Sequence, residues 1–257
     1  MGYVFDFKDA GKYDGWFERP GPLYGFDLEI KLIQKLADQK KGGRLLDIGC
    51  GTGMSLAPFL DQGINLTGID PSPYMLDKAA TRLGSRVDLH RGSAEDLPFD
   101  DNAFDTALFF TSLEFTERPA KAIEEACRVA KDRVIIGVLN RHAPLNMARR
   151  VKSFFFPNIY THAHFFSIWE LKMMLSSILG RVPVKWATTL QFPFVSGAWP
   201  AWVENRGIVQ KSCFGTFIGM CIKPVPKFRT RPLALKIRKR KIYKPAAGLV
   251  PGMRAEK

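Results

Sequence analysis

The sequence predicts an α/β fold with a mainly parallel sheet and helices on both faces. Apolar, β-rich runs alternate with stretches of helical periodicity along residues 44–139, which is typical of strand–helix–strand crossover units. The first run leads into a glycine-rich loop and the second ends in Asp70, an arrangement typical of nucleotide-binding α/β proteins. A chain of 257 residues with 46% hydrophobic residues can also bury one full core in a single domain.

Seven segments have the composition of strands. Short apolar runs rich in β-branched and aromatic residues are expected to form strands when helical segments separate them. The five expected in the first part of the chain are near 44–48, 64–69, 86–90, 103–110 and 132–139. Two further β-rich runs follow at 182–191 and 213–222.

Local end signals predict three of the helices. The segment 24–41 carries apolar residues at three-residue spacing and ends in "KKGG", a basic turn followed by glycine that is typical of a helix end. Residues 73–83 follow Ser72, whose hydroxyl can cap a helix. Ser167 and Glu170 in "SIWE" form a capping box and therefore predict a third helix.

Cysteine usage and the lengths of the apolar runs exclude several protein classes. The four cysteines are scattered, without a CxxC or His/Cys cluster, so we expect neither a disulfide framework nor a metal site. The N-terminus lacks the pattern of a signal peptide, and no apolar run approaches the roughly 18 residues of a membrane span. We therefore expect a cytoplasmic protein.

The net charge of +13 is concentrated at one end of the chain. Residues 224–257 contain eleven Lys or Arg and one Glu, so the basicity belongs to a C-terminal tail and not to the fold. We expect an N-terminal lid and first helix in 1–43, a catalytic domain in 44–223 with a substrate-pocket insertion near 140–212, and this tail.

The glycine loop "LLDIGCGTG" predicts a nucleoside ligand. Gly49, Gly51 and Gly53 lie between a strand and a helix start, where absent side chains let the backbone turn sharply and approach a ligand. Position 54 is Met54 and no Lys-Ser or Lys-Thr pair follows, so the loop matches neither a dinucleotide fingerprint nor a P-loop. Asp70, at the tip of the second strand, can accept both hydroxyls of a ribose.

Four ordered motifs carry a family resemblance. "LLDIGCGTG", "GIDPSPYML", "RGSAEDLPFDDNAFDTALFFTSLEF" and "AIEEACRVAKDRVII" together resemble a class I S-adenosylmethionine-dependent methyltransferase, of the branch similar to ubiquinone/menaquinone-biosynthesis methyltransferases. The resemblance spans about residues 13–222. It implies a Rossmann-like fold with a seven-stranded, mainly parallel sheet, and S-adenosylmethionine as a cofactor that leaves as S-adenosylhomocysteine. The segment that follows the fourth strand reads "TSLEF" where many members have "VLHH". This segment faces the substrate in the family, so the difference concerns the substrate side of the site.

The resemblance assigns a role to each matching position. Asp47 and the loop would meet the methionine end, Asp70 the ribose, and Met75 the adenine. The aromatic lid of this branch would correspond to Tyr13. The cofactor-contacting positions that the resemblance implies are Tyr13, Asp47, Gly49, Cys50, Gly51, Thr52, Gly53, Asp70, Pro71, Ser72, Met75, Ala94, Glu95, Asp96, Phe110 and Thr111.

Several of these residues also have a simpler structural interpretation. Asp47 could cap the turn after its strand, and Asp70 before Pro71 could be an ordinary turn residue. Tyr13 could pack in the core, and Cys50 could fill space in the loop. The glycine loop upstream favours the ligand interpretation for Asp70.

Three residues are candidates for acid–base catalysis. His142 and His164 lie after the fifth strand, where this fold builds its substrate pocket, and Glu114 follows the fourth strand. A base is needed only when the acceptor must lose a proton at neutral pH. The sequence does not rank the three, and each could equally be a polar side chain bonded to the backbone.

Large aromatic residues around 154–202 suggest an aromatic or lipid-like methyl acceptor. The basic tail alternates cations with apolar residues, which suits contact with an anionic membrane, although a solvated tail or an arm that grips RNA also fits. Three hypotheses remain open. The first is a methyltransferase for a small or lipid-like acceptor, the second is an RNA methyltransferase, and the third is a non-catalytic S-adenosylmethionine-binding protein.

Overall fold

The computed structural model describes residues 2–17, 20–37, 41–156, 158–191 and 209–224. The chain divides into two units, Met1–Val225 and Pro226–Lys257. The second unit is the basic tail, and it lies outside the described residues, as does the aromatic stretch at 192–208.

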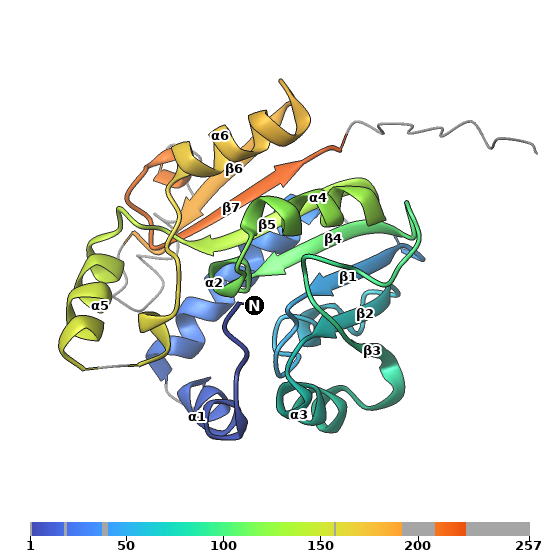
Figure 1. Cartoon of the computed structure of the whole chain (residues 1–257), viewed down its shortest axis with the longest axis horizontal. Coiled ribbons are helices and arrows are strands. Elements are labelled where there is room, and N and C mark those ends of the chain that lie inside the picture. The colour runs from blue at the N-terminus through green and yellow to red at the C-terminus, as the bar shows by residue number, and fades with distance from the viewer. Residues whose placement is uncertain (1, 18–19, 38–40, 157, 192–208, 225–257) are drawn as a thin grey trace, which may run out of the picture. The chain divides into compact units, whose positions relative to one another are not determined.

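A seven-stranded sheet forms the centre of the fold (Figure 1). Its strands are β1 (Arg44–Ile48), β2 (Asn65–Asp70), β3 (Val87–Arg91), β4 (Phe104–Phe110), β5 (Ala130–Leu139), β6 (Val184–Thr189) and β7 (Phe217–Ile222). The spatial order is β3-β2-β1-β4-β5-β7-β6. The first five strands are parallel, and β7 runs antiparallel to both β5 and β6. The predicted fold class is confirmed, and every predicted strand exists within a few residues of its expected bounds.

Helices cover both faces of this sheet (Figure 1). They are α1 (Phe7–Phe17), α2 (Pro20–Ala37), α3 (Pro73–Leu83), α4 (Pro119–Val129), α5 (Pro144–Phe155) and α6 (Ile168–Leu179). Two predicted caps are confirmed. The Ser72 hydroxyl accepts a hydrogen bond from the Met75 amide, and Ser167 and Glu170 form the expected capping box.

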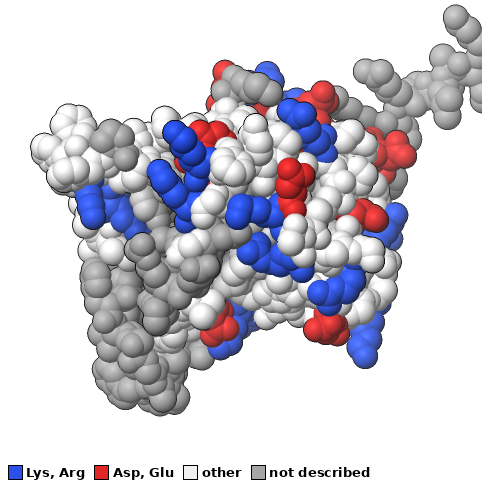
Figure 2. All heavy atoms as spheres, turned by 90° about the horizontal axis from the view of Figure 1, so that it is seen from below, with Lys and Arg blue, Asp and Glu red and all other residues white. Residues whose placement is uncertain are grey.

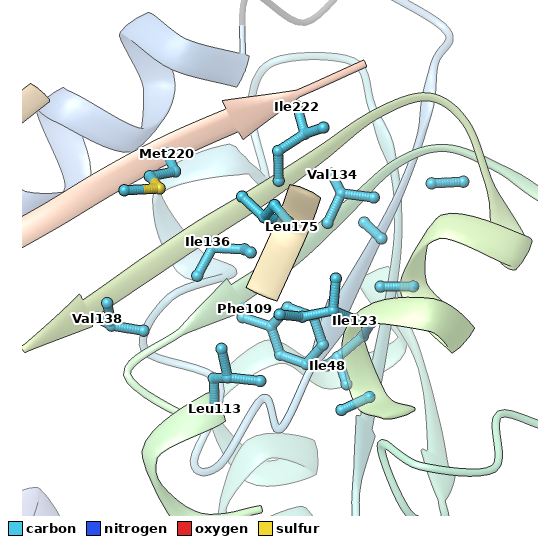
Figure 3. Packing of buried hydrophobic residues seen from close by; sticks show 14 of the residues in the cluster. Ile48, Phe109, Leu113, Ile123, Val134, Ile136, Val138, Leu175, Met220 and Ile222 are labelled. Carbon is cyan, nitrogen blue, oxygen red and sulfur yellow. The ribbon is translucent and has the colours of Figure 1, made fainter. Parts of the chain in front are cut away.

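Two apolar clusters fill the space between the sheet and its helices. One joins the sheet to α4 and α6, and Figure 3 shows its packing around Phe109, Ile136 and Leu175. The other joins the opposite face to α2 and α3. Side chains of β1 alternate between them, since Leu46 belongs to the first cluster and Leu45 to the second. This double burial explains why the central parallel strands β1 and β4 are mainly apolar.

The first helices differ from the prediction. Residues 7–17 form α1, where only a lid segment was expected, and α2 begins at Pro20 and ends at Ala37, four residues earlier at each end than predicted. Proline is favoured in the first turn of a helix because the amide hydrogen that it lacks would have no hydrogen-bond partner there. The sequence "PGPLYG" therefore begins α2, four residues before the predicted start.

Helix α5 was not predicted at all. Its inward residues include the buried polar side chains Asn146 and Ser153, whereas its exposed residues include the large apolar Met147 and Val151. Sequence periodicity identifies a surface helix by an apolar stripe that faces inward. In α5 the apolar residues face outward instead, so the hydrophobic pattern after residue 140 does not predict a surface helix.

Candidate active site

The glycine loop between β1 and β2 has the conformation that its composition requires. Gly49, Gly51 and Gly53 all have positive φ, of 75°, 53° and 79°, a region that other residues enter only at a cost. A Cβ on Gly49 would lie 2.5 Å from the Ser112 Cβ, and one on Gly53 would lie 2.6 Å from a Leu83 methyl carbon. No described atom lies within 4 Å of a Cβ built on Gly51, so this part of the loop faces open space.

Asp70 connects the glycine loop to the start of α3. One carboxylate oxygen accepts a hydrogen bond from the Gly51 amide at 2.9 Å, and the other accepts one from the Ser72 amide at 2.9 Å. Burial raises the pKa of Asp70, and these two amides oppose that shift. The residue expected to hold a ribose therefore also fixes the loop that it faces.

Asp47 lies beneath the loop. Its side chain is fully buried, one oxygen accepts a hydrogen bond from the Ser55 hydroxyl, and the other has no partner among the described residues. Burial raises the pKa of Asp47 to about 7, the Ser55 bond lowers it, and the charge of Asp70 raises it further. An unpartnered buried carboxylate oxygen is costly, which favours a ligand donor close to this position.

The exit of β4 forms the floor of the same region. Thr111 has a φ of 47°, which is unusual for a β-branched residue, and its amide donates to the Gly137 carbonyl at 2.8 Å. The Ser112 hydroxyl donates to the Ile48 carbonyl at 2.5 Å. Strained backbone of this kind persists where the surrounding structure fixes it, often at functional sites.

The segment after β3 forms one side wall. Glu95 accepts hydrogen bonds from the Glu117 and Arg118 amides at 3.0 and 3.3 Å. Farther along, the Arg128 guanidinium donates to the carbonyls of Leu97 and Phe99 at 2.9 and 2.7 Å. These bonds tie the wall to α4 and hold its shape.

Aromatic residues of the N-terminal segment cover the region. The Tyr3 amide donates to the Phe115 carbonyl at 3.0 Å, and the Phe5 ring meets the Phe115 ring edge-on with 5.0 Å between centroids. Phe5 also contacts Tyr13 at 6.3 Å, and Tyr3 stacks on His162 at 4.1 Å. We call Tyr3, Phe5, Tyr13, Phe115 and His162 the aromatic cluster. The sequence predicted only Tyr13 of this set as a lid residue.

These elements enclose one pocket of about 980 Å³, including space open to solvent. The predicted residues that line it are Tyr13, Gly49, Cys50, Gly51, Asp70, Pro71, Met75, Ala94, Glu95, Phe110 and Thr111. The lining residues that the sequence did not single out are Gly2, Tyr3, Val4, Phe5, Ile48, Met54, Ser55, Gly92, Ser93, Ser112, Phe115 and Thr116. Five of these, Ile48, Met54, Ser93, Ser112 and Phe115, stand next to a predicted residue, whereas the N-terminal four carry no motif.

Five predicted residues lie outside the pocket lining. Asp47, Thr52, Gly53 and Ser72 are buried behind the loop or at the start of α3, and Asp96 is exposed. Gly53 and Ser72 have structural roles, because Gly53 packs on Leu83 and Ser72 caps α3. Cys50 lines the pocket, and burial raises the pKa of its thiol well above the usual value, which is unfavourable for a reactive thiolate.

The histidine candidates lie away from the pocket. None of the four histidines is among the lining residues of the pocket in the described ranges. The His164 Nε2 is 2.7 Å from Glu170 and 3.1 Å from the Arg141 guanidinium, on the surface. His142 is exposed and meets the Trp169 ring edge-on at 5.7 Å.

Glu114 is buried beside the aromatic cluster residue Phe115. One oxygen accepts a hydrogen bond from the Leu139 amide at 2.7 Å, and the other has no partner among the described residues. Burial raises the pKa of Glu114 to about 8, against the effect of the Leu139 bond, and the charge of Glu29 adds to the rise. Burial also raises the pKa of Glu29 to about 8.

We expect Glu114→Gln to flatten the dependence of stability on pH. Because the pKa of Glu114 is raised from 4.5 to about 8, the folded protein keeps a proton that the unfolded chain loses. Stability therefore falls as the pH rises through this window, by up to about 1.4 kcal/mol for each pH unit. Urea unfolding at about pH 5 and about pH 8 measures the change. Glu29→Gln removes the other carboxyl whose pKa is raised to about 8 and should flatten the dependence as well. If the free energy of unfolding changes with pH equally in wild type and Glu114→Gln, the raised pKa of Glu114 would be contradicted.

The described residues contain no group of three or more His, Cys, Asp and Glu side chains placed to hold a metal ion. None of their helices has the length and apolar character needed to cross a bilayer.

The comparisons with known proteins agree with this geometry. Residues 46–136 match the family described as "Methyltransferase domain". An uncharacterized protein of Methanocaldococcus jannaschii is 39% identical over 180 residues, which are 68% of this chain and 80% of that protein. A demethylmenaquinone methyltransferase of Paenarthrobacter aurescens is 37% identical over 101 residues, but these are only 39% of this chain and 40% of that enzyme.

Solved structures show the same fold. A SAM-dependent methyltransferase from Thermotoga maritima superimposes with a TM-score of 0.65, at 24% identity, over 85% of this chain and 97% of that one.

Proposed function

Because the chain belongs to the class I S-adenosylmethionine-dependent methyltransferases, we propose that its acceptor is a small molecule that presents an aromatic ring and an apolar body. The protein is an enzyme, and S-adenosylmethionine is its cofactor. The observation that carries the proposal about the acceptor is the aromatic cluster, of which Tyr3, Phe5, Tyr13 and Phe115 line the pocket.

The residues present fit the cofactor. Gly51 offers open space where any side chain would fill the cradle, and Asp47 has a buried oxygen without a described partner. Asp70 would accept the ribose hydroxyls, the loop amides and Asp47 would face the methionine end, and Met75 with Glu95 would border the adenine. Bound there, the cofactor supplies a methyl group on a sulfonium, which is already a good leaving group.

Two features of the pocket favour an apolar, aromatic acceptor. Val4, Phe5, Phe110 and Phe115 line it with apolar surface, and rings prefer edge-to-face contacts of the kind that Phe5 and Phe115 already make. The relative from Paenarthrobacter aurescens bears the name demethylmenaquinone methyltransferase. That likeness supports a quinol-type ring as the acceptor class.

Positioning is the main catalytic contribution that we propose for the protein. Thr111, Phe110 and the aromatic rings of the N-terminal segment line the same pocket, so an acceptor ring would be held in a fixed orientation while water is excluded. Since His142 and His164 lie away from the lining and Glu114 is buried behind it, we propose that no histidine acts as the base. Carbon methylation of an electron-rich ring suits such a site.

Transfer of a labelled methyl group tests the proposal. The full-length protein and labelled S-adenosylmethionine would be added to a native cell extract, which is then divided into organic, nucleic-acid, protein and small-solute fractions. We expect the label in the organic phase. Asp70→Ala is the matched control, because it should bind less cofactor and transfer correspondingly little label.

Each other outcome would contradict a specific part of the proposal. Label in RNA would show an RNA methyltransferase and would give the basic tail the role of a phosphate-gripping arm. Label in none of the fractions, with the cofactor still bound, would favour a non-catalytic cofactor-binding protein. Purification of labelled quinols from the organic phase would identify the acceptor class.

A further inference from the structure

Helix α5 presents its apolar side chains outward. Met147, Val151, Phe154 and Phe155 are 55%, 62%, 85% and 68% exposed, and their spacing places them along one face of a helix. We call these four residues the apolar face of α5. A set of large exposed side chains grouped on one helix marks an interaction surface, unlike single exposed apolar residues, which are ordinary.

The opposite side of α5 is fixed by polar contacts. The Asn146 amide group donates to the carbonyls of Asn140 and Thr216 at 3.0 and 2.8 Å, and its carbonyl oxygen accepts from Arg149 at 2.9 Å. The Ser153 hydroxyl is turned back onto the Arg150 carbonyl at 2.8 Å. The helix therefore cannot simply rotate its apolar face into the core, because buried Asn146 would lose its two hydrogen bonds to the Asn140 and Thr216 carbonyls.

The charged side chains on α5 itself are all cations. No Asp or Glu occurs in the sequence between Arg133 and Glu170, whereas this stretch contains Arg141, Arg149, Arg150 and Lys152. Arg150 and Lys152 are exposed. The left-hand side of the view in Figure 2, where α5 lies in Figure 1, shows blue and white spheres and no red ones among the described residues.

We propose that the apolar face of α5 docks on an anionic membrane surface. A short helix with large apolar side chains on one face and cations beside them is the arrangement that inserts into the boundary between headgroups and acyl chains. Cations next to that face would contact anionic headgroups.

This surface connects with the pocket through a short path along the chain. After α5, Ile159–Thr161 form a single helical turn, and the next residue, His162, stacks on Tyr3 of the aromatic cluster. A docked α5 would place the covered side of the pocket near the lipid surface. The inference does not depend on the acceptor, since it is carried by α5 alone.

Vesicle binding by the full-length protein tests the inference. Co-sedimentation with vesicles of phosphatidylcholine and phosphatidylglycerol in equal amounts would compare wild type with the double variant Phe154→Ser/Phe155→Ser. We expect the partition coefficient to fall at least tenfold in the variant. Phe7→Ser is the matched control, because Phe7 is 73% exposed but lies on α1. It should bind like wild type.

A second pair of variants tests the charges. Arg150→Glu/Lys152→Glu should weaken binding to anionic vesicles several-fold, whereas Lys131→Glu/Lys185→Glu, which makes the same charge change on exposed positions of β5 and β6, should have a smaller effect. All variants keep the basic tail, so differences between them report on α5.

Three outcomes would overturn the inference. Equal partition of wild type and Phe154→Ser/Phe155→Ser, with unchanged thermal unfolding, would show that α5 does not contact lipid. Failure of wild type to bind anionic vesicles would have the same meaning. A wild-type dimer in light scattering that the double variant converts to a monomer would assign the face to a second copy of the chain.

Discussion

Asp70→Ala is expected to weaken the binding of S-adenosylmethionine by about tenfold or more. The carboxylate lines the pocket and holds the Gly51 and Ser72 amides at 2.9 Å each. Alanine would remove the acceptor for the ribose hydroxyls and also release the glycine loop. Each hydrogen bond to a charged group contributes about 1.5–3 kcal/mol, and about 1.4 kcal/mol corresponds to tenfold in affinity. Isothermal titration with cofactor and with S-adenosylhomocysteine measures the loss.

Asp70→Asn separates the two contributions of Asp70. Asparagine retains one oxygen that can accept from Ser72, but it presents an NH₂ group where the second carboxylate oxygen accepts from Gly51. We expect its affinity to lie between those of wild type and Asp70→Ala. Unchanged affinity in Asp70→Ala, with the protein still folded, would count directly against the assignment of the pocket.

Gly49→Ala is expected to destabilise the protein by roughly 2–5 kcal/mol and to abolish measurable cofactor binding. The new Cβ would lie 2.5 Å from the Ser112 Cβ, and Ser112 cannot easily move because its hydroxyl is bonded to the Ile48 carbonyl. A positive φ of 75° adds about 1–2 kcal/mol for a residue with a side chain, and overpacking adds about 1–3 kcal/mol. Urea unfolding and isothermal titration measure the two effects.

Gly63→Ala is the matched control for Gly49→Ala. Gly63 has a similar φ of 66°, but no described atom lies within 4 Å of a Cβ built there. It should therefore lose about 1–2 kcal/mol from backbone strain alone and keep its cofactor affinity. If both variants lose the same stability, the close contact between Gly49 and Ser112 is not the cause.

The fold could be predicted from the sequence because its strong signals are local. The central parallel strands β1 and β4 are buried on both faces and mainly apolar, and the helices α3 and α6 carry their own capping signals. The caps at Ser72 and Ser167 depend on only four residues and were predicted correctly. Most of the loop side of the pocket followed from these elements.

The other side of the pocket could not be predicted for a physical reason. Gly2 to Phe5 reach the pocket through contacts with Phe115, more than a hundred positions away along the chain, and no local pattern encodes such a contact. Helix α5 escaped detection because its apolar residues face outward. The candidates His142 and His164 were chosen by chain position alone, which does not specify where a side chain points.

A crystal structure of the protein with S-adenosylhomocysteine would test the central claim most directly. We predict that the ribose hydroxyls of S-adenosylhomocysteine lie within hydrogen-bond distance of the Asp70 carboxylate. Its amino-acid end should lie against Gly49 to Gly51, and its sulfur near Thr111. Binding of S-adenosylhomocysteine at any other place, with the Asp70 carboxylate left to the Gly51 and Ser72 amides alone, would contradict it.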